Sequence, residues 1–480
     1  MPEACWASPS SKWRFRVWLG YCPLAKSRIL SQLFPRYAGL FMPFNDPRGR
    51  RDAPRRAAMI GGYSHTLGAF VRAQYLAATL RSTSAIARHH DRQIGRLIAH
   101  VLPRFPFYQP HLQGGFAGLP IMDKATLMAS FADCNLGGFS AAFVRQSLLE
   151  GRDGVDGFHF GQSTGTSGNR GYYVISERER FVWLGTILAK TLPDALWRSH
   201  RVAIALPGMS SLYQSARAGS RIGLAFYDTA EGIEAWEDAL VRFDPDTIVA
   251  SPKVLRHLAE RRKLPARGIF SGAEVLDPLD RAAIEGATGR TVREIYMATE
   301  GLLGVSCRHG VLHLAEDVVH FEWEDAPGDG TLKTPIVTDF TRTAQAMVRY
   351  RMNDLLELSH EPCPCGSAFQ RVKAVHGRAD DIFMLATSSG AIITVTPDVV
   401  RNAIVDAHPG IADFRAVQTG PAAIAITLVG AEGDIASRAR AALERKLEHL
   451  GITAEIVPHD GIAVPFDRKL RRVRRDWSPG

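Results

Sequence analysis

The chain has 480 residues, of which 46% are hydrophobic and 22% charged, an ordinary composition for a globular protein of two or three domains. No stretch is apolar over the length that a bilayer crossing needs, so we expect no membrane span. Most of the net charge of +9 lies in residues 1–58, where eleven Lys or Arg residues outnumber three Asp or Glu residues and contribute +8. The remainder is nearly neutral, which argues against a broad basic surface for nucleic acid.

Residues 1–58 have no apolar core of the signal-peptide type and end in the Arg- and Pro-rich run PRGRRDAPRR. Three interpretations remain open for this leader: an over-long start, a disordered basic arm, or an organelle address. We favour the first, with folding expected to begin near Met59. Six cysteines without an export signal predict reduced thiols in a cytoplasmic protein.

The middle of the chain predicts alternating helices and strands. Helical spacing runs from about Met59 to Leu102, and another helix opens at Asp123. After a glycine-rich loop, YYVIS (172–176) predicts a strand and ERERFVWLGTILAKTL (177–192) a helix. Three apolar runs, at 202–206, 222–227 and 247–251, then alternate with helical stretches at 234–243 and 252–262. This alternation indicates a largely parallel sheet with helices on both faces.

The pattern changes at Gly377, where a β-α-β-β-α-β succession of about a hundred residues is typical of a ferredoxin-like α+β domain. The predicted fold is therefore α/β. A large N-terminal domain, 59–376, has mixed or parallel sheets with flanking helices, and a small mobile α+β domain, 377–480, follows it.

The segment GQSTGTSGNRG (161–171) has two incompatible interpretations. Its start fits G-x-S-x-G, which would make Ser163 the nucleophile of an α/β-hydrolase. A nucleophile elbow needs a helix directly after the serine, whereas three glycines and the strand former YYVI follow here. Glycines free to take positive φ favour a loop whose N–H and hydroxyl groups bind phosphate. The serine hydrolase remains the alternative function. A surface Gly/Ser hairpin without a functional role is the third interpretation.

Six segments in order resemble the adenylate-forming superfamily, which activates carboxylic acids with ATP, and are closest to its phenylacetate–CoA ligase and deazaflavin-coenzyme synthetase branch. They are STGTSG (163–168), FSGAEVLD (270–277), IYMATEG (295–301), TDFTRTAQAMVRYRMNDLLEL (338–358), HGRADDIF (376–383) and PFDRKLRRV (465–473). Each is weak alone, but their order over three hundred residues is specific. The resemblance covers roughly Met59 to the C-terminus.

The resemblance implies a phosphate loop that cradles the β- and γ-phosphates of ATP. Its residues are Ser163, Thr164, Gly165, Thr166, Ser167 and Gly168. Many relatives continue this loop with lysines, which Asn169 and Arg170 replace here, so Arg170 is expected to supply the charge.

Two further motifs would bind the nucleotide's other end and its metal. Gly272, Ala273 and Glu274 would lie on the adenine side, and Tyr296 would stack on the adenine. Thr299 would contact phosphate and the substrate carboxylate. Glu300 would hold Mg²⁺, which prefers oxygen ligands.

The last three motifs imply a ribose site, a hinge and a catalytic lysine. Asp354 would bind both ribose hydroxyls; Asn353 replaces the usual glycine before it and is expected to tolerate a left-handed backbone. Arg378 would reach the ribose or phosphate, and Asp380 would be the hinge of the small domain. Lys469 would stabilise the charge that develops at the α-phosphorus. A plain basic tail is the alternative there, because Arg468 replaces the usual glycine.

The implied chemistry has two steps: a carboxylic acid and MgATP give an acyl-adenylate, and a thiol then takes the acyl group. The acid is expected to be aromatic, in a pocket lined from 207–228 by Tyr213, Phe226 and Tyr227, with core packing as the alternative. CoA and the phosphopantetheine of an acyl carrier protein present the same thiol, so both remain acceptors. A homodimer is possible, and no nucleic-acid partner is expected.

Cys307, His313, Cys363 and Cys365 follow two of these motifs and form a candidate Cys₃His site for structural Zn²⁺. The C-x-C spacing is tighter than usual, and scattered reduced thiols are the alternative. Four protein ligands leave no open position, which disfavours a catalytic role. His309 is the spare ligand.

Overall fold

The computed structural model describes residues 53–163, 171–207, 222–264, 266–328, 330–430, 433–459, 464 and 468–478, with only the backbone at 53–61. The predictions for Thr164, Gly165, Thr166, Ser167 and Gly168 therefore lie outside the described residues. The same holds for Arg170 and Tyr213.

Two helices replace the single helical run predicted from Met59 to Leu102. The first, α3 (Ala53–Thr79), begins six residues earlier than expected, and Ser82 then caps the second, α4 (Thr83–Arg96). Short helical turns follow at η3 (Leu97–Val101), η4 (Leu102–Arg104), η5 (Gln109–Gly114) and η6 (Ala132–Cys134). Among the described residues, no helix combines the length and apolar content that a membrane crossing requires.

The predicted helix at Asp123 is α5 (Lys124–Ala129), whose cap Asp123 accepts a hydrogen bond of 2.8 Å from the backbone of Thr126. Helix α6 (Ala141–Leu149) follows and packs against a small antiparallel sheet. The sheet consists of β1 (Gly154–Val155), β2 (Phe158–Gln162) and β3 (Tyr172–Ser176).

The predicted strand YYVIS is β3, and the predicted helix after it is α7 (Glu177–Thr191). Ser176 and Glu179 form a capping box at the start of α7, so two backbone N–H groups that the helix leaves unpaired find acceptors.

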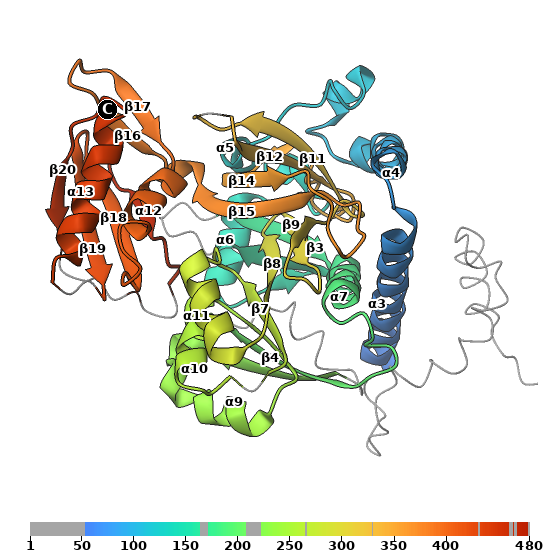
Figure 1. The fold of residues 1–480 in the computed structure, drawn as a ribbon. Helices are drawn as coiled ribbons and strands as arrows, with labels where there is room; N and C mark the ends of the chain where they lie inside the picture. Colours follow the sequence, from blue (N-terminus) through green and yellow to red (C-terminus); the bar gives the residue numbers. More distant parts are fainter. Residues whose placement is uncertain are drawn as a thin grey trace, which may run out of the picture.

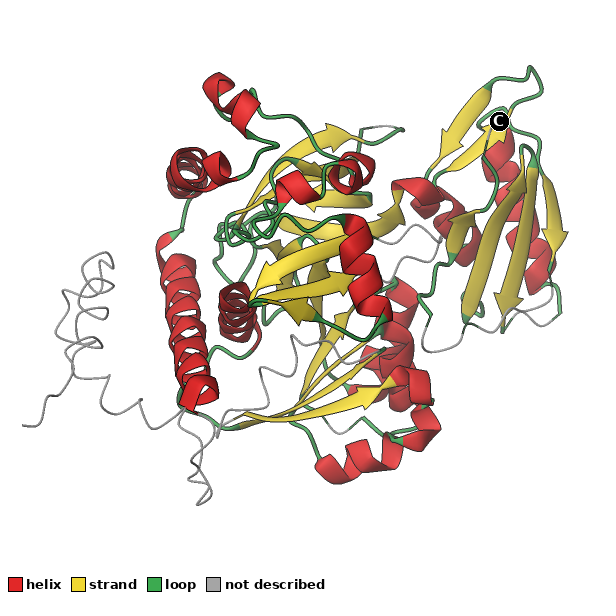
Figure 2. Cartoon of the chain, turned by 180° about the vertical axis from the view of Figure 1, so that it is seen from behind, coloured by secondary structure: helices red, strands yellow, loops and turns green. Residues whose placement is uncertain are grey.

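The large domain is built on one twisted sheet of twelve described strands (Figures 1 and 2). Its order is β11-β12-β14-β15-β10-β9-β8-β7-β6-β4-β5, with β13 paired to β12. The parallel half contains β4 (His200–Leu206), β5 (Ile222–Asp228), β6 (Thr247–Ala250), β7 (Gly268–Gly272) and β8 (Val292–Ala298). The antiparallel half contains β9 (Gly301–Ser306), β10 (Leu312–Leu314), β11 (Val319–Asp325), β12 (Leu332–Asp339), β13 (Tyr350–Arg351), β14 (Asp354–Ser359) and β15 (Arg371–Arg378). The sheet is thus mixed, which confirms the predicted fold class, although the largely parallel sheet that the alternation indicated describes only half of it.

Helices cover both faces of the parallel half, as the apolar runs predicted. Alternate residues of β4 point to opposite faces of the sheet. Ala203 and Ala205 pack on one face, here called the first. The other face, called the second, is packed by Val202, Ile204 and Leu206. The first face carries α9 (Glu237–Phe243), α10 (Pro252–Glu260) and α11 (Pro278–Thr288), after the turns η8 (Thr229–Glu231) and η9 (Ile233–Ala235). The second face carries α7 and α3, which approach closely at Gly185, where a Cβ would meet the carbonyl of Thr66 at 2.1 Å.

The small domain has its own core, and Leu279 of α11 packs against it. Its sheet has the order β20-β19-β18-β21 and is flanked by two helices. Its elements are η10 (Ala379–Asp381), β16 (Phe383–Ala386), β17 (Ile392–Val395), α12 (Pro397–Val405), β18 (Asp413–Gly420), β19 (Ala423–Val429), α13 (Ile435–Glu448), β20 (Glu455–Pro458) and β21 (Val473–Arg475).

This sheet departs from the expected ferredoxin-like arrangement. The first strand of the predicted succession, β17, pairs with β16 in a separate hairpin. The tail strand β21 instead pairs in parallel with β18. The tight turn at Gly390 (φ +83°) folds β17 back on β16, which leaves the edge of β18 open for the tail.

Candidate active site

Three predicted nucleotide-binding residues meet at the start of β14. The Tyr296 hydroxyl donates a hydrogen bond of 2.7 Å to Asp354 Oδ2. Arg378, directly opposite in the β14–β15 register, has its Nε 3.9 Å from Asp354 Oδ1. Burial and the neighbouring Asp354 carboxylate raise the pKa of Tyr296 well above its ordinary value, so Tyr296 is a stable donor. Strands β8, β14 and β15 therefore form a site with an aromatic ring, a carboxylate and a cation.

Thr299 and Glu300 follow at the turn between β8 and β9. Thr299 Oγ1 donates a hydrogen bond of 2.9 Å to Glu300 Oε2, and Arg342 donates one of 3.0 Å to the Thr299 carbonyl. Burial raises the pKa of Glu300, and the charge of Asp354 raises it further. Tyr350 also contacts Glu300, so this half-buried carboxylate lies among hydrogen-bond donors with the acidic group of Asp354 nearby. Two neighbouring carboxylates favour a bound cation.

The Gly272–Ala273–Glu274 segment turns sharply at the end of β7. Gly272 ends the strand, and Ala273 has φ +67°, a left-handed conformation that costs a non-glycine residue about 1–2 kcal/mol. Burial raises the pKa of Glu274, although the ammonium of Lys253 opposes this rise. The Glu274 side chain is only 7% exposed and lies 3.2 Å from Lys253 Nζ. A strained turn thus directs a buried carboxylate toward another cation.

Ser163 and Gly171 close the base of the glycine-rich segment. Ser163 N donates to Gly171 O at 2.7 Å, and Gly171 N donates to Ser163 Oγ at 2.9 Å. The segment therefore joins two antiparallel strands, and the serine's hydroxyl is used as an acceptor. The strand β3 follows where an α/β-hydrolase would have its helix, so the geometry at both ends gives the serine hydrolase no support.

Lys469 reaches the same site from the small domain. Glu274, Asp354 and Glu300 each act electrostatically on its partly buried ammonium. Burial lowers the pKa of Lys469, Arg378 lowers it further, and the three carboxylates only partly offset them. Arg468, at the position where the sequence resemblance leads us to expect a glycine, is exposed. The predicted lysine is thus beside the predicted nucleotide residues, although nearly two hundred residues separate it from Glu274.

Asp380 lies in the turn η10 at the junction of the domains. Asn353 Nδ2 donates a hydrogen bond of 2.6 Å to Asp380 Oδ2, and Ala379 N donates to Asn353 O at 2.9 Å. Asn353 is absent from the described residues with positive φ, so the expected left-handed role is wrong. Its amide instead ties the junction to the start of β14.

The structure does not support the predicted aromatic substrate pocket at residues 222–228, the part of its expected lining (207–228) in which Phe226 and Tyr227 lie. Tyr227 stacks near Trp236 with 5.3 Å between ring centroids, and its hydroxyl bonds to Ala239 O at 3.3 Å. Phe226 packs against the core formed with α3 and α7. Both side chains belong to the core, which was the alternative interpretation.

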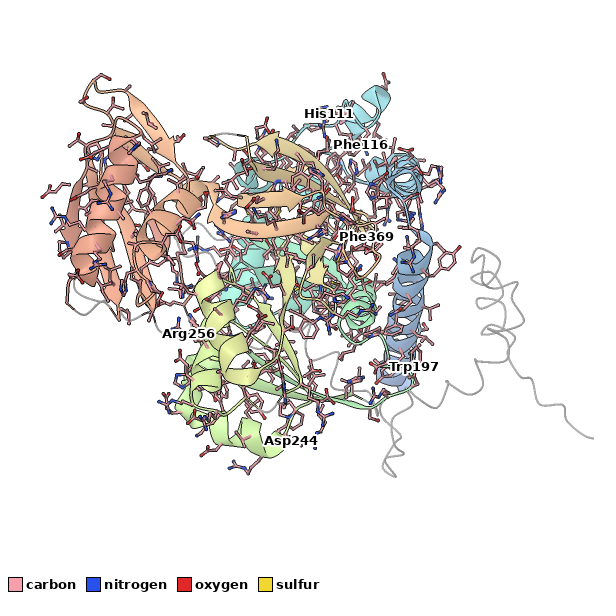
Figure 3. All side chains as sticks on the ribbon, viewed as in Figure 1. His111, Phe116, Trp197, Asp244, Arg256 and Phe369 are labelled. Atoms are coloured by element: carbon pink, nitrogen blue, oxygen red, sulfur yellow. The ribbon has the colours of Figure 1, made fainter. Side chains whose placement is uncertain are left out.

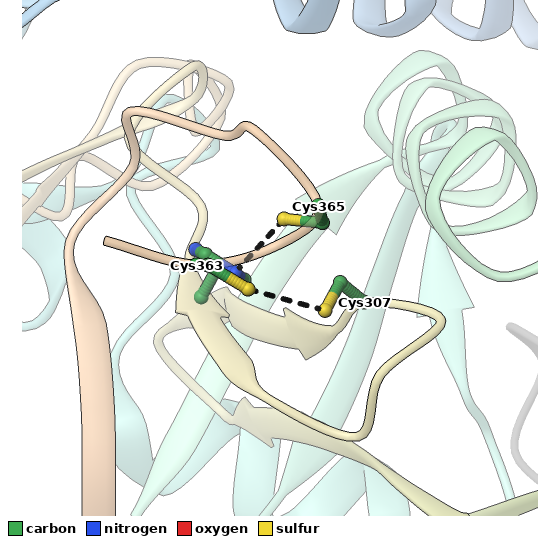
Figure 4. A group of neighbouring side chains, drawn as sticks. Cys307, Cys363 and Cys365 are labelled. Atoms are coloured by element: carbon green, nitrogen blue, oxygen red, sulfur yellow. Dashed lines mark hydrogen bonds between the residues drawn. The ribbon is translucent and has the colours of Figure 1, made fainter. Parts of the chain in front are cut away.

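Cys307, His313, Cys363 and Cys365 come together as predicted, with all ligand atoms within 4.8 Å of one another. The loop after β9 carries Cys307, and the loop between β14 and β15 carries the other two cysteines (Figure 4). The spare candidate His309 bonds instead to Arg308 at 3.0 Å. Two loops far apart in sequence, together with His313 on strand β10, thus present one donor set.

The distances fit a tetrahedral zinc ion. Bonds of about 2.3 Å to sulfur and about 2.0–2.1 Å to nitrogen place two sulfurs about 3.8 Å apart and a sulfur and a nitrogen about 3.6 Å apart. The Cys307 and Cys363 Sγ atoms are 3.8 Å apart, and Cys365 Sγ is 3.4 Å from His313 Nε2. His313 Nδ1 lies 3.0 Å from the Phe369 carbonyl, which orients the ring as in known zinc sites.

Three residues at the site had no role in the sequence analysis. Tyr350 contacts Glu300; Lys253 pairs with Glu274; and Lys124 approaches the base of the glycine-rich segment, where a Cβ on Gly171 would lie 3.4 Å from its Cε. The only signal for Lys124 was its place at the start of a predicted helix. No local pattern marks Lys253.

No family model matches the chain. A phenylacetate–coenzyme A ligase of Thermus thermophilus is 24% identical over 363 residues, which cover 65% of this chain and 75% of that protein. Protein CapK of Staphylococcus aureus is 26% identical over 180 residues, which cover 36% of this chain and 39% of that protein.

Two solved structures of 2-hydroxyisobutyryl-CoA ligase share the fold. The postadenylation state in complex with 2-HIB-AMP has a TM-score of 0.57 at 19% identity and covers 95% of this chain and 94% of that chain. The open conformation with 2-HIB-AMP and CoA has a TM-score of 0.52 at 20% identity, covering 82% and 91%. Sequence and fold together confirm the resemblance to the adenylate-forming superfamily.

Proposed function

We propose that this chain, which has the adenylate-forming fold and a phenylacetate–CoA ligase among its relatives, activates a carboxylic acid with ATP and transfers the acyl group to a thiol. In the first step a carboxylate oxygen attacks the α-phosphorus and pyrophosphate leaves. In the second step a thiolate attacks the acyl carbonyl and AMP leaves. The observation that carries the proposal is the Asp354 carboxylate held between the Tyr296 hydroxyl and Arg378, with the charges of Asp354 and Glu300 acting on Lys469.

Each group has a place in this reaction. Asp354 accepts from the ribose hydroxyls, and Tyr296 presents its ring to the adenine while its hydroxyl fixes the Asp354 carboxylate. Glu300 offers an oxygen ligand to the Mg²⁺ that accompanies ATP. Lys469 places its ammonium where charge develops at the α-phosphorus, within a partly buried setting that strengthens the interaction.

The acceptor is proposed to be CoA, because the Thermus relative is named as a coenzyme A ligase and one of the structures with the same fold contains CoA. An acyl carrier protein presents the same phosphopantetheine thiol and is the second acceptor to test. The acid is proposed to be aromatic, as the name of the Thermus relative suggests.

We also propose that the Cys₃His cluster holds a structural Zn²⁺. All four positions are filled by protein ligands, so a bound ion would tie the two loops together without an open site for chemistry. The cysteine loop lies at the far end of the β14–β15 hairpin, about 16 Å along the strand from Asp354. Zinc there would stabilise the hairpin that carries Asp354 and Arg378.

The test is acid-dependent release of pyrophosphate from ATP by the full chain. Aryl acids should release pyrophosphate, and adding CoA should convert the bound adenylate to a thioester that mass spectrometry detects. Ester hydrolysis without ATP, lost in Ser163→Ala, would instead support a hydrolase. Conversion only with a pantetheinylated carrier protein would reassign the acceptor.

A further inference from the structure

The backbone around Lys469 is held on both sides by the large domain. Lys253, at the start of α10, donates a hydrogen bond from Nζ to the carbonyl of Arg468. The backbone of Leu470 acts on the Glu274 carboxylate and lowers its pKa, against the larger opposite effect of burial. These two contacts flank the one residue of the small domain that is proposed to act on the α-phosphorus.

Lys253 and Glu274 are themselves an ion pair. Lys253 Nζ lies 3.2 Å from Glu274 Oε1, and the two side chains are only 10% and 7% exposed. Both follow adjacent parallel strands: Lys253 lies in the first turn of helix α10 after β6, and Glu274 lies in the turn after β7. The strained backbone at Ala273 directs Glu274 toward Lys253, which gives that conformation a function.

We propose that Lys253 and Glu274 are positioning residues that grip the peptide on either side of Lys469 and so hold its ammonium at the reacting phosphate. Neither side chain needs to touch the substrate. Lys253 fixes the preceding carbonyl and Glu274 the following amide, which sets the direction of the Lys469 side chain between them. This positioning role, called the grip below, rests on the proposed function. It assigns Glu274 a contact with the segment around Lys469 in place of the expected contact with adenine.

The same contacts explain why Arg468 is tolerated where relatives have glycine. Arg468 contributes its carbonyl to Lys253, while its own side chain is exposed. It is not among the described residues with positive φ, so this backbone needs no glycine. The grip depends on the main chain and leaves the side chain at 468 free to vary.

The experiment compares Lys253→Met and Glu274→Gln with the full-length wild type in both half-reactions. Misplacing a catalytic group by about 1 Å costs up to about a hundredfold, so adenylation should fall between about ten- and a hundredfold. Thioester formation from supplied acyl-adenylate should change less than about twofold, because Lys469 acts in the first step. Lys263→Met is the matched control: Lys263 pairs with Glu237 at 2.8 Å and Asp238 at 2.9 Å, away from Lys469.

A double-mutant cycle separates positioning from general stability. In a Lys469→Ala background, Lys253→Met should cause no further loss of adenylation, because the residue it positions is gone. The proposal would be overturned if the double variant lost adenylation activity by the product of the two single losses. Equal losses in both half-reactions for Lys253→Met would also overturn it.

Hydrogen exchange of the amides at 468–471 supplies a readout that does not depend on activity. Glu274→Gln should speed exchange at Leu470, and Lys263→Met should not. Unchanged exchange would refute the grip. Wild-type protein without acid-dependent pyrophosphate release would refute the proposed function instead, while exchange would still decide whether the contacts exist.

Discussion

Replacing Asp280 by Asn should weaken adenylation by loosening the small domain. Asp280, in the first turn of α11, is 1% exposed and accepts two hydrogen bonds, of 2.7 and 2.9 Å, from Arg472 near the C-terminus. Arg256 of α10, which is labelled in Figure 3, adds one of 3.3 Å and also donates to Ala412 O of the small domain at 3.1 Å. One buried carboxylate thus joins arginines from both domains.

The free energy that Asp280→Asn is expected to cost depends on which ion-pair partners Arg472 and Arg256 retain. Removing one partner of a buried ion pair costs about 3–5 kcal/mol when the other charge is left alone. Here Arg472 retains Asp413 at 2.7 Å, and Arg256 retains Glu260 at 2.7 Å. Burial alone would lower the pKa of Arg472, but the charges of Asp280 and Asp413 raise it overall, so the guanidinium stays charged. We therefore expect about 2 kcal/mol, which corresponds to about a thirtyfold change.

The assay measures both half-reactions. The sequence resemblance implies that the small domain turns about a hinge at Asp380 between the two steps, and a turn that separates Arg472 from Asp280 would break these contacts. Asp280→Asn should therefore slow adenylation about thirtyfold and leave thioester formation from supplied adenylate unchanged or faster. Glu260→Gln, which removes the exposed partner of Arg256, is the control and should have little effect. An equal loss in both steps, or none in either, would refute the reasoning.

Four further outcomes are expected. Because burial and Arg378 lower the pKa of Lys469, the alkaline decline of pyrophosphate release should begin at lower pH than for an ordinary lysine; Lys469→Arg should remove that decline, and an unchanged profile would contradict the assignment. Lys124→Ala should raise the KM for ATP about tenfold and leave AMP binding unchanged in a titration, since Lys124 lies at the base of the glycine-rich segment that we propose binds the phosphates; equal weakening of both would be a contrary result. Purified protein should contain about one zinc per chain by elemental analysis, and Cys363→Ser should lose it and melt at lower temperature, whereas metal-free wild type of equal stability would exclude the site. Ser163→Ala should reduce adenylation by only about tenfold, because its Oγ closes the segment by one hydrogen bond; complete loss would point to a nucleophile.

The sequence predicted most of the local structure because strong local signals specify it. Strand β3 and helix α7 follow from YYVIS and the Ser176–Glu179 box, and Tyr296 and Asp354 were assigned together through motif order. The sequence did not predict the helix start at Ala53, because this residue lies within the Arg- and Pro-rich run 47–56. Such ends depend on weak local preferences.

Contacts between distant segments could not be predicted. Lys253 lies 215 residues before Arg468 and Asp280 192 residues before Arg472, and neither pair leaves a pattern in the sequence. The strand pairing of the small-domain sheet was predicted wrongly for the same reason. The composition of β17 favours a strand, but whether that strand pairs with β16 or with β18 depends on the Gly390 turn and on the returning tail strand. Tyr227 was assigned to a pocket because its alternation fits either face of β5.

The central claim is that Lys469, Asp354 and Glu300 form one site that adenylates a carboxylic acid. Its most direct test is pyrophosphate release from ATP by the full chain across a panel of aryl and fatty acids, with Lys469→Ala in parallel. The account predicts acid-dependent release that is strongest with aryl acids and falls by about a hundredfold or more in Lys469→Ala. No acid-dependent release from folded protein, or release that Lys469→Ala leaves intact, would contradict it.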